Sequence, residues 1–171
     1  MLMFDGCCGT KGASASMLDH GWEVITLDID LAFLPDIVCD IREYSYSGPK
    51  PTLMWFSPPC TDFSFNDKPW NKDKQRPIDL SIYEACLRIV KETNPDFWII
   101  ENVRGAIKYF GPPKAKRGPF YLWGYFPPLA PFKLNYKRKD SYSGRNPELR
   151  AAIPYELSDQ VRLAIERNPY W

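Results

Sequence analysis

Short apolar runs alternate with helix-periodic segments through the first hundred residues of the chain. Five of these runs predict β-strands, at residues 2–4, 23–27, 36–39, 53–56 and 97–100. The runs are continuous rather than alternating, which is typical of strands buried on both faces of a parallel sheet. The pattern therefore indicates an open sheet with its strands in a central layer.

Three helices are expected around these strands. One spans residues 13–20 and ends at Gly21, a natural helix stop. A second spans 79–93 with apolar residues at helical spacing, and a third spans 158–167 with Ser158 as its N-cap. The alternating order predicts an α/β, Rossmann-like fold, a mostly parallel sheet with helices on both faces.

The length of 171 residues suits a single domain over residues 1–171. Residues 105–150 differ from the rest, because they hold seven of the seventeen prolines and ten of the twenty-six aromatic residues. We expect a small insertion of loops and short strands there, at 121–126 and 133–136. Residues 151–171 are expected to return to the core.

The net charge of +1 hides a basic segment. Residues 104–150 contain eleven basic and two acidic residues, a balance of +9, so the remainder carries −8. Such a segment indicates a surface that faces a polyanion, with a solvated charged loop as the alternative. The residues expected to contact nucleic acid are Arg104, Lys137, Arg138, Lys139 and, for stacking or filling a gap, the aromatic Trp123 or Tyr125. A satellite core beneath the loops is the alternative for these aromatics.

Other classes are disfavoured. No run of about 18 apolar residues exists and the start lacks signal-peptide features, so we expect a cytoplasmic protein without membrane contact. Five cysteines and one histidine match no zinc-binding spacing and no disulfide framework, so no metal is expected.

Polar residues follow the predicted strands, at the edge where α/β sheets bind ligands. The turn at residues 5–12 is rich in glycine, which lets a ligand approach the backbone, and it lacks the pattern of a phosphate-binding P-loop. Asp28 ends the second strand, where a carboxylate can accept both hydroxyls of a ribose. Asp40 and Ile41 follow the third strand, placed to reach an adenine edge. Singly, each acid also suits an ordinary surface position.

The fourth strand leads into Ser57-Pro58-Pro59-Cys60, and the fifth ends in Glu101-Asn102-Val103. Two prolines fix the backbone, so the cysteine is held rigidly at the sheet edge. Neighbouring strand ends lie about 5 Å apart, which brings Glu101 close to Cys60. A thiol beside a carboxylate at this edge indicates a nucleophile rather than an inert buried cysteine.

These two motifs resemble the catalytic pair of the cytosine-C5 DNA methyltransferases, and the whole chain resembles the short, phage-type members of that family. The resemblance implies a class I methyltransferase fold, S-adenosylmethionine as cofactor and DNA as partner, with the target cytosine flipped from the stack. It implies catalytic roles for Cys60, Glu101, Pro59 and Asn102. The residues that it places around the cofactor are Asp5, Cys8, Gly9, Thr10, Lys11, Asp28, Ile29, Asp40, Ile41 and Ser57. A segment at 150–158 resembles the one that completes the cofactor pocket.

The chain departs from the larger members of the family. Lys11 replaces a glycine of the cofactor loop, and neither a Gln-x-Arg-x-Arg motif nor a separate target-recognition domain is found. The sequence therefore leaves open C5 methylation of RNA or of a free cytosine nucleotide, and a non-catalytic nucleic-acid-binding relative. An amino-directed DNA methyltransferase is disfavoured, because its sheet-edge motif has an aromatic residue where this chain has Cys60.

Overall fold

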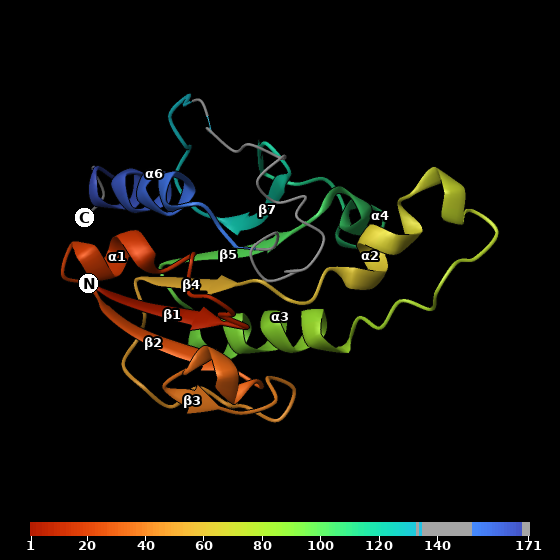
Figure 1. Cartoon of the computed structure of the whole chain (residues 1–171). Coiled ribbons are helices and arrows are strands. Elements are labelled where there is room, and N and C mark those ends of the chain that lie inside the picture. Colours follow the sequence, from red (N-terminus) through yellow and green to blue (C-terminus); the bar gives the residue numbers. More distant parts are fainter. Residues whose placement is uncertain (133, 135–151, 169–171) are drawn as a thin grey trace.

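A seven-stranded sheet forms the centre of the structure, a computed structural model that describes residues 1–132, 134 and 152–168 (Figure 1). In spatial order the strands are β3 (Ile37–Val38), β2 (Glu23–Asp28), β1 (Leu2–Gly6), β4 (Leu53–Phe56), β5 (Phe97–Asn102), β7 (Phe120–Tyr125) and β6 (Ala115–Arg117). Among the described strands, β7 is antiparallel to both β5 and β6, and the other neighbouring pairs are parallel. The order confirms the expected Rossmann-like α/β fold, a mostly parallel sheet with helices on both faces.

The strand order reverses between β1 and β4. From β1 the chain winds outward through β2 and β3, and it then returns to place β4 on the other side of β1. In doubly wound sheets a ligand binds beyond the carboxyl ends of the strands at such a switch point. The carboxyl ends of β1 and β4 point to the same edge, on the right of Figure 1, and this edge is where a binding site is expected.

Side chains of the central strands alternate between two hydrophobic cores, one on each face of the sheet. In β4, Leu53 and Trp55 enter one core, and Met54 and Phe56 enter the other. All four are fully buried, as the continuous apolar run predicts. At roughly 2 kcal/mol for each buried large side chain, this strand contributes strongly to stability.

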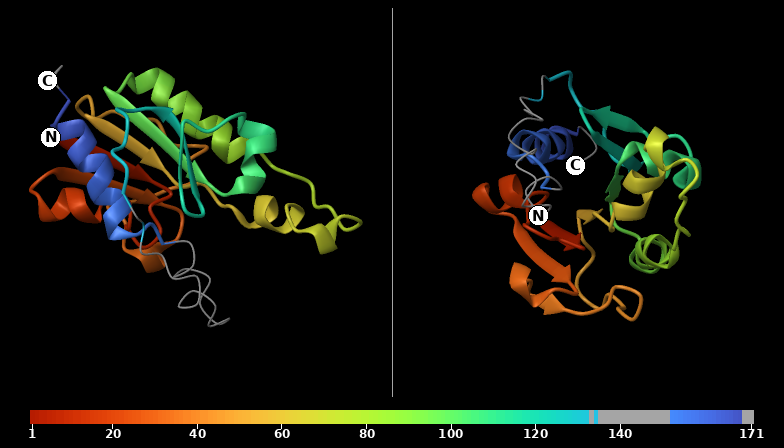
Figure 2. Two further views of the ribbon diagram at one scale, coloured as in Figure 1. Left: turned by 90° about the horizontal axis from the view of Figure 1, so that it is seen from above. Right: turned by 45° about the vertical axis from the view of Figure 1, so that its right-hand side comes forward.

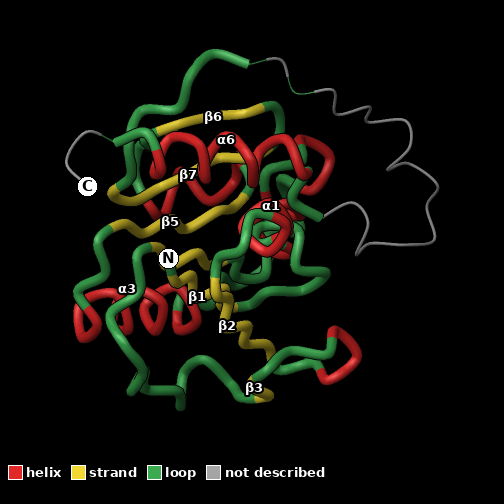
Figure 3. The backbone as a smooth tube through the Cα atoms, turned by 90° about the vertical axis from the view of Figure 1, so that its left-hand side faces the viewer, coloured by secondary structure: helices red, strands yellow, loops and turns green. Residues whose placement is uncertain are grey.

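Helices cover both faces. Helices α1 (Ala15–Asp19) and α6 (Tyr155–Glu166) lie on one side, and α3 (Ser81–Thr93) lies on the other (Figure 3). Two further short helices are α2 (Thr61–Asn66) and α4 (Ile107–Phe110), and 3-10 turns lie at Leu31–Phe33, Pro69–Asn71 and Arg104–Ala106. No helix among the described residues is both long and apolar enough to cross a membrane.

Helix α6 lies against α1, far away in the sequence. The Ser158 hydroxyl accepts a hydrogen bond from the Ser16 amide (3.1 Å) and donates one to the Ala13 carbonyl (2.6 Å). The expectation that Ser158 caps the last helix was wrong, because the helix begins three residues earlier and Ser158 is buried between two helices. Its hydroxyl satisfies backbone groups of α1 instead.

Of the other elements predicted from the sequence, most strands were confirmed and some elements were missed. The first five strands were confirmed to within two residues at each end, and the strand expected at 121–126 is β7. The strand expected at 133–136 lies almost wholly outside the described residues. Strand β6 and helix α2 were missed. Figure 2 shows that α2 and the chain after it project away from the body of the sheet.

Candidate active site

The ends of three neighbouring strands place the two predicted catalytic motifs side by side. Gly6 in β1 pairs with Phe56 in β4, and Phe56 pairs with Ile100 in β5. Ser57 follows Phe56 directly after the end of β4, and Glu101 follows Ile100 within β5. Because adjacent strands lie about 4.8 Å apart, the loop after Ser57 starts beside Glu101, as the sequence predicted.

Cys60 lies at the end of this loop, immediately before α2. Its carbonyl oxygen accepts a hydrogen bond from the Ser64 amide at 2.8 Å, so Cys60 begins the helix, and its side chain is half-buried. Pro58 is buried and Pro59 is exposed. Since the rings fix two consecutive φ angles, the backbone that carries Cys60 is held in a defined course at the sheet edge.

Asn102 holds the loop against β5. Its side-chain amide donates a hydrogen bond to the Pro58 carbonyl at 2.9 Å, and its side-chain oxygen accepts one from the Val103 amide at 2.9 Å. The residue is 1% exposed. It therefore positions the Cys60 loop rather than contacting a substrate, which corrects the expectation of a direct catalytic role.

Glu101 is a buried carboxyl group, and no charged group among the described residues pairs with it. Burial alone raises its pKa to about 8, and among the described residues no group donates a hydrogen bond to it. At neutral pH the carboxyl group is therefore largely protonated. A neutral carboxylic acid has one hydroxyl donor and one carbonyl acceptor, so it can recognise a molecule edge that offers an acceptor beside a donor.

Two of the other cysteines, Cys7 and Cys8, are poor nucleophiles. Burial and the charge of Asp5 raise the pKa of Cys8 to about 12. The thiol of Cys7 has its pKa raised by a hydrogen bond with Cys86 and by burial, and Cys86 is fully buried. Since the thiolate is the reactive form, the raised pKa values make Cys7 and Cys8 poor nucleophiles at neutral pH.

The glycine-rich turn after β1 closes against the end of β2. The Cys8 amide donates to the Leu27 carbonyl at 3.1 Å, and the Gly9 amide donates to Asp28 Oδ2 at 2.9 Å. Gly9 has a φ of +48°, and no atom lies within 4 Å of where a Cβ would sit. The turn thus leaves open space beside a carboxylate, as a site for a bound molecule requires.

Asp28 is fixed with its oxygens at the edge. Oδ1 accepts the Asp30 amide at 3.0 Å and Oδ2 accepts the Gly9 amide, and each oxygen keeps a lone pair. Exposed Ile29 follows it. A carboxylate with lone pairs beside an apolar side chain has the chemistry to hold a ribose and its base, the role expected for Asp28.

Asp5 lies beneath the turn instead of on its surface. It is completely buried, its Oδ2 accepts a hydrogen bond from the Ser14 hydroxyl at 2.7 Å, and its Oδ1 has no partner among the described residues. Burial raises its pKa to about 7, opposed by the bond from Ser14. The expected direct contact of Asp5 with a cofactor does not fit this burial, so its role is to shape the turn.

Lys11 and Thr10 complete the turn. Lys11 adopts a φ of +59°, and its ammonium donates to the Leu34 carbonyl at 2.6 Å. The lysine thus ties the turn to the segment after β2. Thr10 is exposed at the surface of the turn. Both positions stay accessible to a molecule bound at Asp28.

The two residues expected at an adenine edge have different environments. Arg42 binds both oxygens of Asp40, and the hydrogen bonds lower the pKa of Asp40 to about 2. Ile41 is 4% exposed and packs into the core on the α3 side of the sheet. Contact of the Ile41 side chain with a ligand is therefore a wrong expectation, whereas Asp40 stays at the surface.

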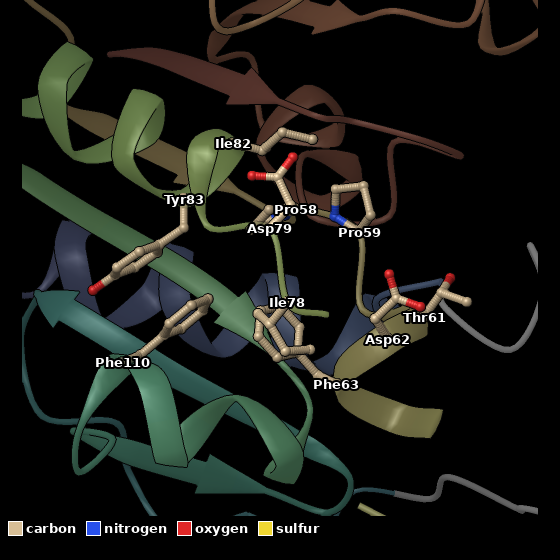
Figure 4. A pocket seen from close by; sticks show the side chains of 10 residues that line it. All are labelled: Pro58, Pro59, Thr61, Asp62, Phe63, Ile78, Asp79, Ile82, Tyr83 and Phe110. Atoms are coloured by element: carbon tan, nitrogen blue, oxygen red, sulfur yellow. The ribbon is translucent and has the colours of Figure 1, made fainter. Parts of the chain in front are cut away.

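A pocket of about 200 Å³ adjoins the Cys60 loop (Figure 4). Its wall is formed by Pro58, Pro59, Thr61, Asp62, Phe63, Ile78, Asp79, Ile82, Tyr83 and Phe110. The rings of Tyr83 and Phe110 stack with centroids 3.7 Å apart. Neither Cys60 nor Glu101 lines this pocket, so it lies behind the two prolines rather than at the reacting groups.

The predicted nucleic-acid contacts are only partly described. Lys137, Arg138 and Lys139 lie outside the described residues. Arg104 is exposed at the end of β5 and forms an ion pair with Asp67 at 2.9 Å. It therefore lies at the same edge as Glu101.

Trp123, expected to stack on a base or to belong to a satellite core, is buried and is not available for stacking. It is 5% exposed, its indole donates to the Gly111 carbonyl at 2.8 Å, and its ring packs edge-on against Phe110. Tyr125 is exposed, but it pairs with Trp98 at the start of β5. Since β7 is antiparallel, Tyr125 lies at the opposite edge of the sheet from Cys60. The alternative of a satellite core holds for Trp123.

Two features near the Cys60 loop, the close contact at Gly105 and the exposed Trp70, were not predicted from the sequence. Gly105, in the 3-10 turn after β5, lets α2 approach this turn, because a Cβ there would lie 2.3 Å from the Phe63 carbonyl oxygen. The segment after α2 exposes Trp70 beside several lysines. These lysines are visible in the sequence, but the exposure of Trp70 depends on how the chain folds around it.

The strand order and the ligand-binding edge define a Rossmann-like α/β fold. Residues 36–109 match the family model of the C-5 cytosine-specific DNA methylases. The Type II methyltransferase M.SacI of Streptomyces achromogenes is 39% identical over 57 residues, which cover 32% of this chain and 14% of M.SacI. The family match agrees with the resemblance to the cytosine-C5 DNA methyltransferases over residues 36–109, and the chain spans about one seventh of the length of M.SacI.

Two solved structures have a similar chain course. One is a prophage-encoded protein of E. coli described as a DNA modification methyltransferase, with a TM-score of 0.48 and 20% identity, covering 64% of this chain and 34% of that one. The other is the Entamoeba histolytica methyltransferase EhMeth, with a TM-score of 0.43 and 16% identity, covering 80% of this chain and 55% of that one.

Proposed function

We propose that this chain transfers a methyl group from S-adenosylmethionine to C5 of cytosine in DNA, with Cys60 as the covalent nucleophile. The observation that carries the proposal is the hydrogen bond from Asn102 to the Pro58 carbonyl. That bond fixes the Cys60 loop to the strand that bears Glu101. A thiol and a neutral carboxyl group then face one edge, together with the turn that suits a cofactor.

Glu101 is suited to the cytosine edge. Its protonated carboxyl can donate a hydrogen bond to N3 and accept one from the exocyclic amino group. The pKa of about 8 keeps that proton available at neutral pH. Because N3 gains proton density through this bond, the ring becomes more susceptible to addition at C6.

Cys60 then makes the covalent bond. Its thiolate adds to C6, which places an enamine-like electron pair at C5 while the proton from Glu101 is held at N3. S-adenosylmethionine would supply the electrophilic methyl group to C5, with its S–CH3 bond breaking to leave S-adenosylhomocysteine. Loss of the C5 proton to a base restores the ring double bond as Cys60 leaves from C6, and the proton at N3 returns to Glu101.

The chain's own residues fit the cofactor at the switch point. Asp28 has lone pairs for the ribose hydroxyls, Gly9 leaves open space, and Ile29 offers an exposed apolar surface. Thr10, Lys11, Asp40 and Ser57 border the same edge. The Ser57 hydroxyl accepts a hydrogen bond from the Trp55 indole at 3.0 Å, which fixes its orientation.

DNA as the partner requires the target cytosine to leave the duplex, at a cost of a few kcal/mol. The basic balance of residues 104–150 favours a polyanion. Arg104, three residues after Glu101, stays exposed at this edge beside its partner Asp67, so a phosphate could share its guanidinium.

Trapping with 5-fluorocytosine tests the proposal. Fluorine at C5 cannot leave as a proton, so the adduct should persist after methyl transfer and mass spectrometry should find it on Cys60. Duplex DNA, single-stranded DNA, RNA and dCMP carrying the analogue separate the substrate classes. Cys60→Ser should abolish trapping but keep cofactor binding, because a hydroxyl is a much weaker nucleophile. An adduct on another cysteine, or full turnover by Cys60→Ser, would refute the mechanism.

A further inference from the structure

The loop from Asp67 to Arg76 follows α2 directly and lies beyond the carboxyl edge of the sheet (Figure 2). It starts one helix of six residues after Cys60, or about 9 Å along the helix axis at 1.5 Å per residue. Every residue of this 67–76 loop except Asn71 is exposed. The loop is thus a surface element next to the proposed nucleophile.

Specific hydrogen bonds give the 67–76 loop a defined shape. At its base, Asn66 donates to the Arg76 carbonyl and accepts from the Arg76 amide, both at 2.8 Å. Inside it, the Asn71 side chain donates to the Phe65 carbonyl at 3.0 Å, and Gln75 donates to the Asn71 carbonyl at 2.9 Å. A loop held in this way loses less conformational entropy when it binds a partner.

The loop is also tied to its surroundings. The Asp67 carboxylate is bound by Arg104 at the end of β5, at 2.9 Å. The Arg76 guanidinium lies over the Phe65 ring, 3.8 Å from its centroid, and pairs with Asp62 at 3.2 Å. These contacts neutralise Asp67 and Arg76 within the protein. The charges that face solvent are therefore carried by the residues between them.

The tip of the loop combines an exposed indole with ammonium groups. Trp70 is 74% exposed, and Lys68 Nζ lies 5.8 Å from its ring centroid. Lys68, Lys72 and Lys74 are exposed and form no ion pair with any described residue, and Asp73 is the acid that opposes them. An exposed indole surrounded by net positive charge is typical of surfaces that bind single nucleic-acid strands.

We propose that the 67–76 loop binds the DNA strand beside the target, with an unpaired base stacked on Trp70 and phosphates bound by Lys68, Lys72 and Lys74. The inference rests on the proposed function, since the loop continues the helix that begins at Cys60. A paired base inside a duplex has both faces covered by its neighbours. Stacking on Trp70 therefore requires a base from single-stranded DNA, or one left unpaired when its partner leaves the duplex.

Binding of Trp70 variants tests this inference apart from catalysis. All variants are made in the Cys60→Ser background, and a labelled cytosine-containing oligonucleotide is titrated as a single strand and as a duplex. Trp70→Ala should weaken binding about 5- to 150-fold, the loss expected for one stacked base, and Trp70→Phe should recover most of it. If Trp70→Ala weakens binding of the single strand only, the stacked base comes from single-stranded DNA. If it weakens binding of both oligonucleotides, the stacked base comes from an opened duplex.

Tyr125→Ala is the matched control. Tyr125 is also exposed and also lies beside a lysine, with Lys114 Nζ 5.3 Å from its ring centroid, but at the opposite edge of the sheet. It should bind both oligonucleotides as the parent does. Unchanged binding by Trp70→Ala, or an equal loss with Tyr125→Ala, would overturn the inference.

The lysines are tested through the salt dependence of binding. Replacing Lys68, Lys72 and Lys74 by Gln should reduce the slope of log K against log salt by about 2 for a single strand. A double Gln variant of Lys50 and Lys91, on the far side of the molecule, should leave the slope unchanged. An unchanged slope in the triple variant would contradict the phosphate contacts.

The two proposals fail separately. If the parent chain forms the 5-fluorocytosine adduct while Trp70→Ala binds normally, the loop inference is wrong and the methyl-transfer proposal stands. If no substrate gives an adduct although binding depends on Trp70, the loop inference stands and the catalytic proposal is wrong.

Discussion

The side-chain amide of Asn102 donates a hydrogen bond to the carbonyl oxygen of Pro58, 44 residues earlier, at 2.9 Å. This one bond joins the ends of β4 and β5 where the two predicted catalytic motifs begin. Asn102 is almost fully buried, so water cannot replace the lost partner. The bond therefore determines where the Cys60 loop lies relative to Glu101.

Removing that bond should loosen the loop. Asn102→Ala leaves the Pro58 carbonyl without its donor, which should lower the free energy of unfolding by about 1–3 kcal/mol in denaturant titrations. Asn102→Asp keeps an acceptor for the Val103 amide but loses the donor to Pro58. Both variants should form the 5-fluorocytosine adduct more slowly, with little change in cofactor affinity. Parent-like trapping by Asn102→Asp would show that the Pro58 bond does not position Cys60.

The sequence anticipated the strands because they are buried on both faces. A short, continuous apolar run between turn residues is typical of such a strand, and the run at Leu53–Phe56 was located without error. The same pattern placed Cys60 and Glu101 at one edge. The bond between Asn102 and Pro58 was not visible, because it depends on a register between residues that are distant in the chain.

Helix α2 and Trp123 show where local patterns fail. The α2 segment, Thr61–Asn66, contains no strong helix former, and it forms where Phe63 packs over Gly105 and against Phe110. The exposure of an aromatic residue also depends on tertiary packing. Trp123 and Trp70 are chemically identical, but one is enclosed by Phe110 and Gly111 and the other lies at a loop tip.

Gly105 should be essential to the position of α2. An Ala side chain would place its Cβ 2.3 Å from the Phe63 carbonyl oxygen, a backbone atom that cannot turn aside. Gly105→Ala should therefore displace α2, reduce the rate of trapping by Cys60 at least tenfold and lower the melting temperature. Gly21→Ala serves as the control, since Gly21 has a φ of +75° and open space around it. It should cost about 1–2 kcal/mol through backbone strain but leave trapping by the folded fraction unchanged.

Asp28 should account for part of the affinity for the cofactor. Asp28→Ala removes the acceptors that we assign to the ribose hydroxyls, so calorimetry should show S-adenosylmethionine binding weakened by about 1–3 kcal/mol. Asp30→Ala is the neighbouring control, because the Asp30 carboxylate accepts from Ala32 within its own exposed turn. Equal losses in the two variants would indicate a change in the shape of the segment rather than a contact made by Asp28.

The pH dependence of stability should reveal the buried acid Glu101. Its pKa is about 8 in the folded chain and about 4.5 when exposed, so the folded state holds a proton that the unfolded state releases between these values. Stability from this group is therefore fully present below about pH 4.5 and is lost as the pH rises toward 8, by up to a few kcal/mol. Asp5, with a pKa of about 7, contributes a loss of the same sign that ends at a lower pH.

Glu101→Gln should flatten the part of the decline between pH 7 and 8 and make the chain more stable than the parent at pH 9, as chemical denaturation at each pH can measure. A parent whose stability rises from pH 5 to pH 8, or a Glu101→Gln variant with an unchanged profile, would show that Glu101 ionises normally.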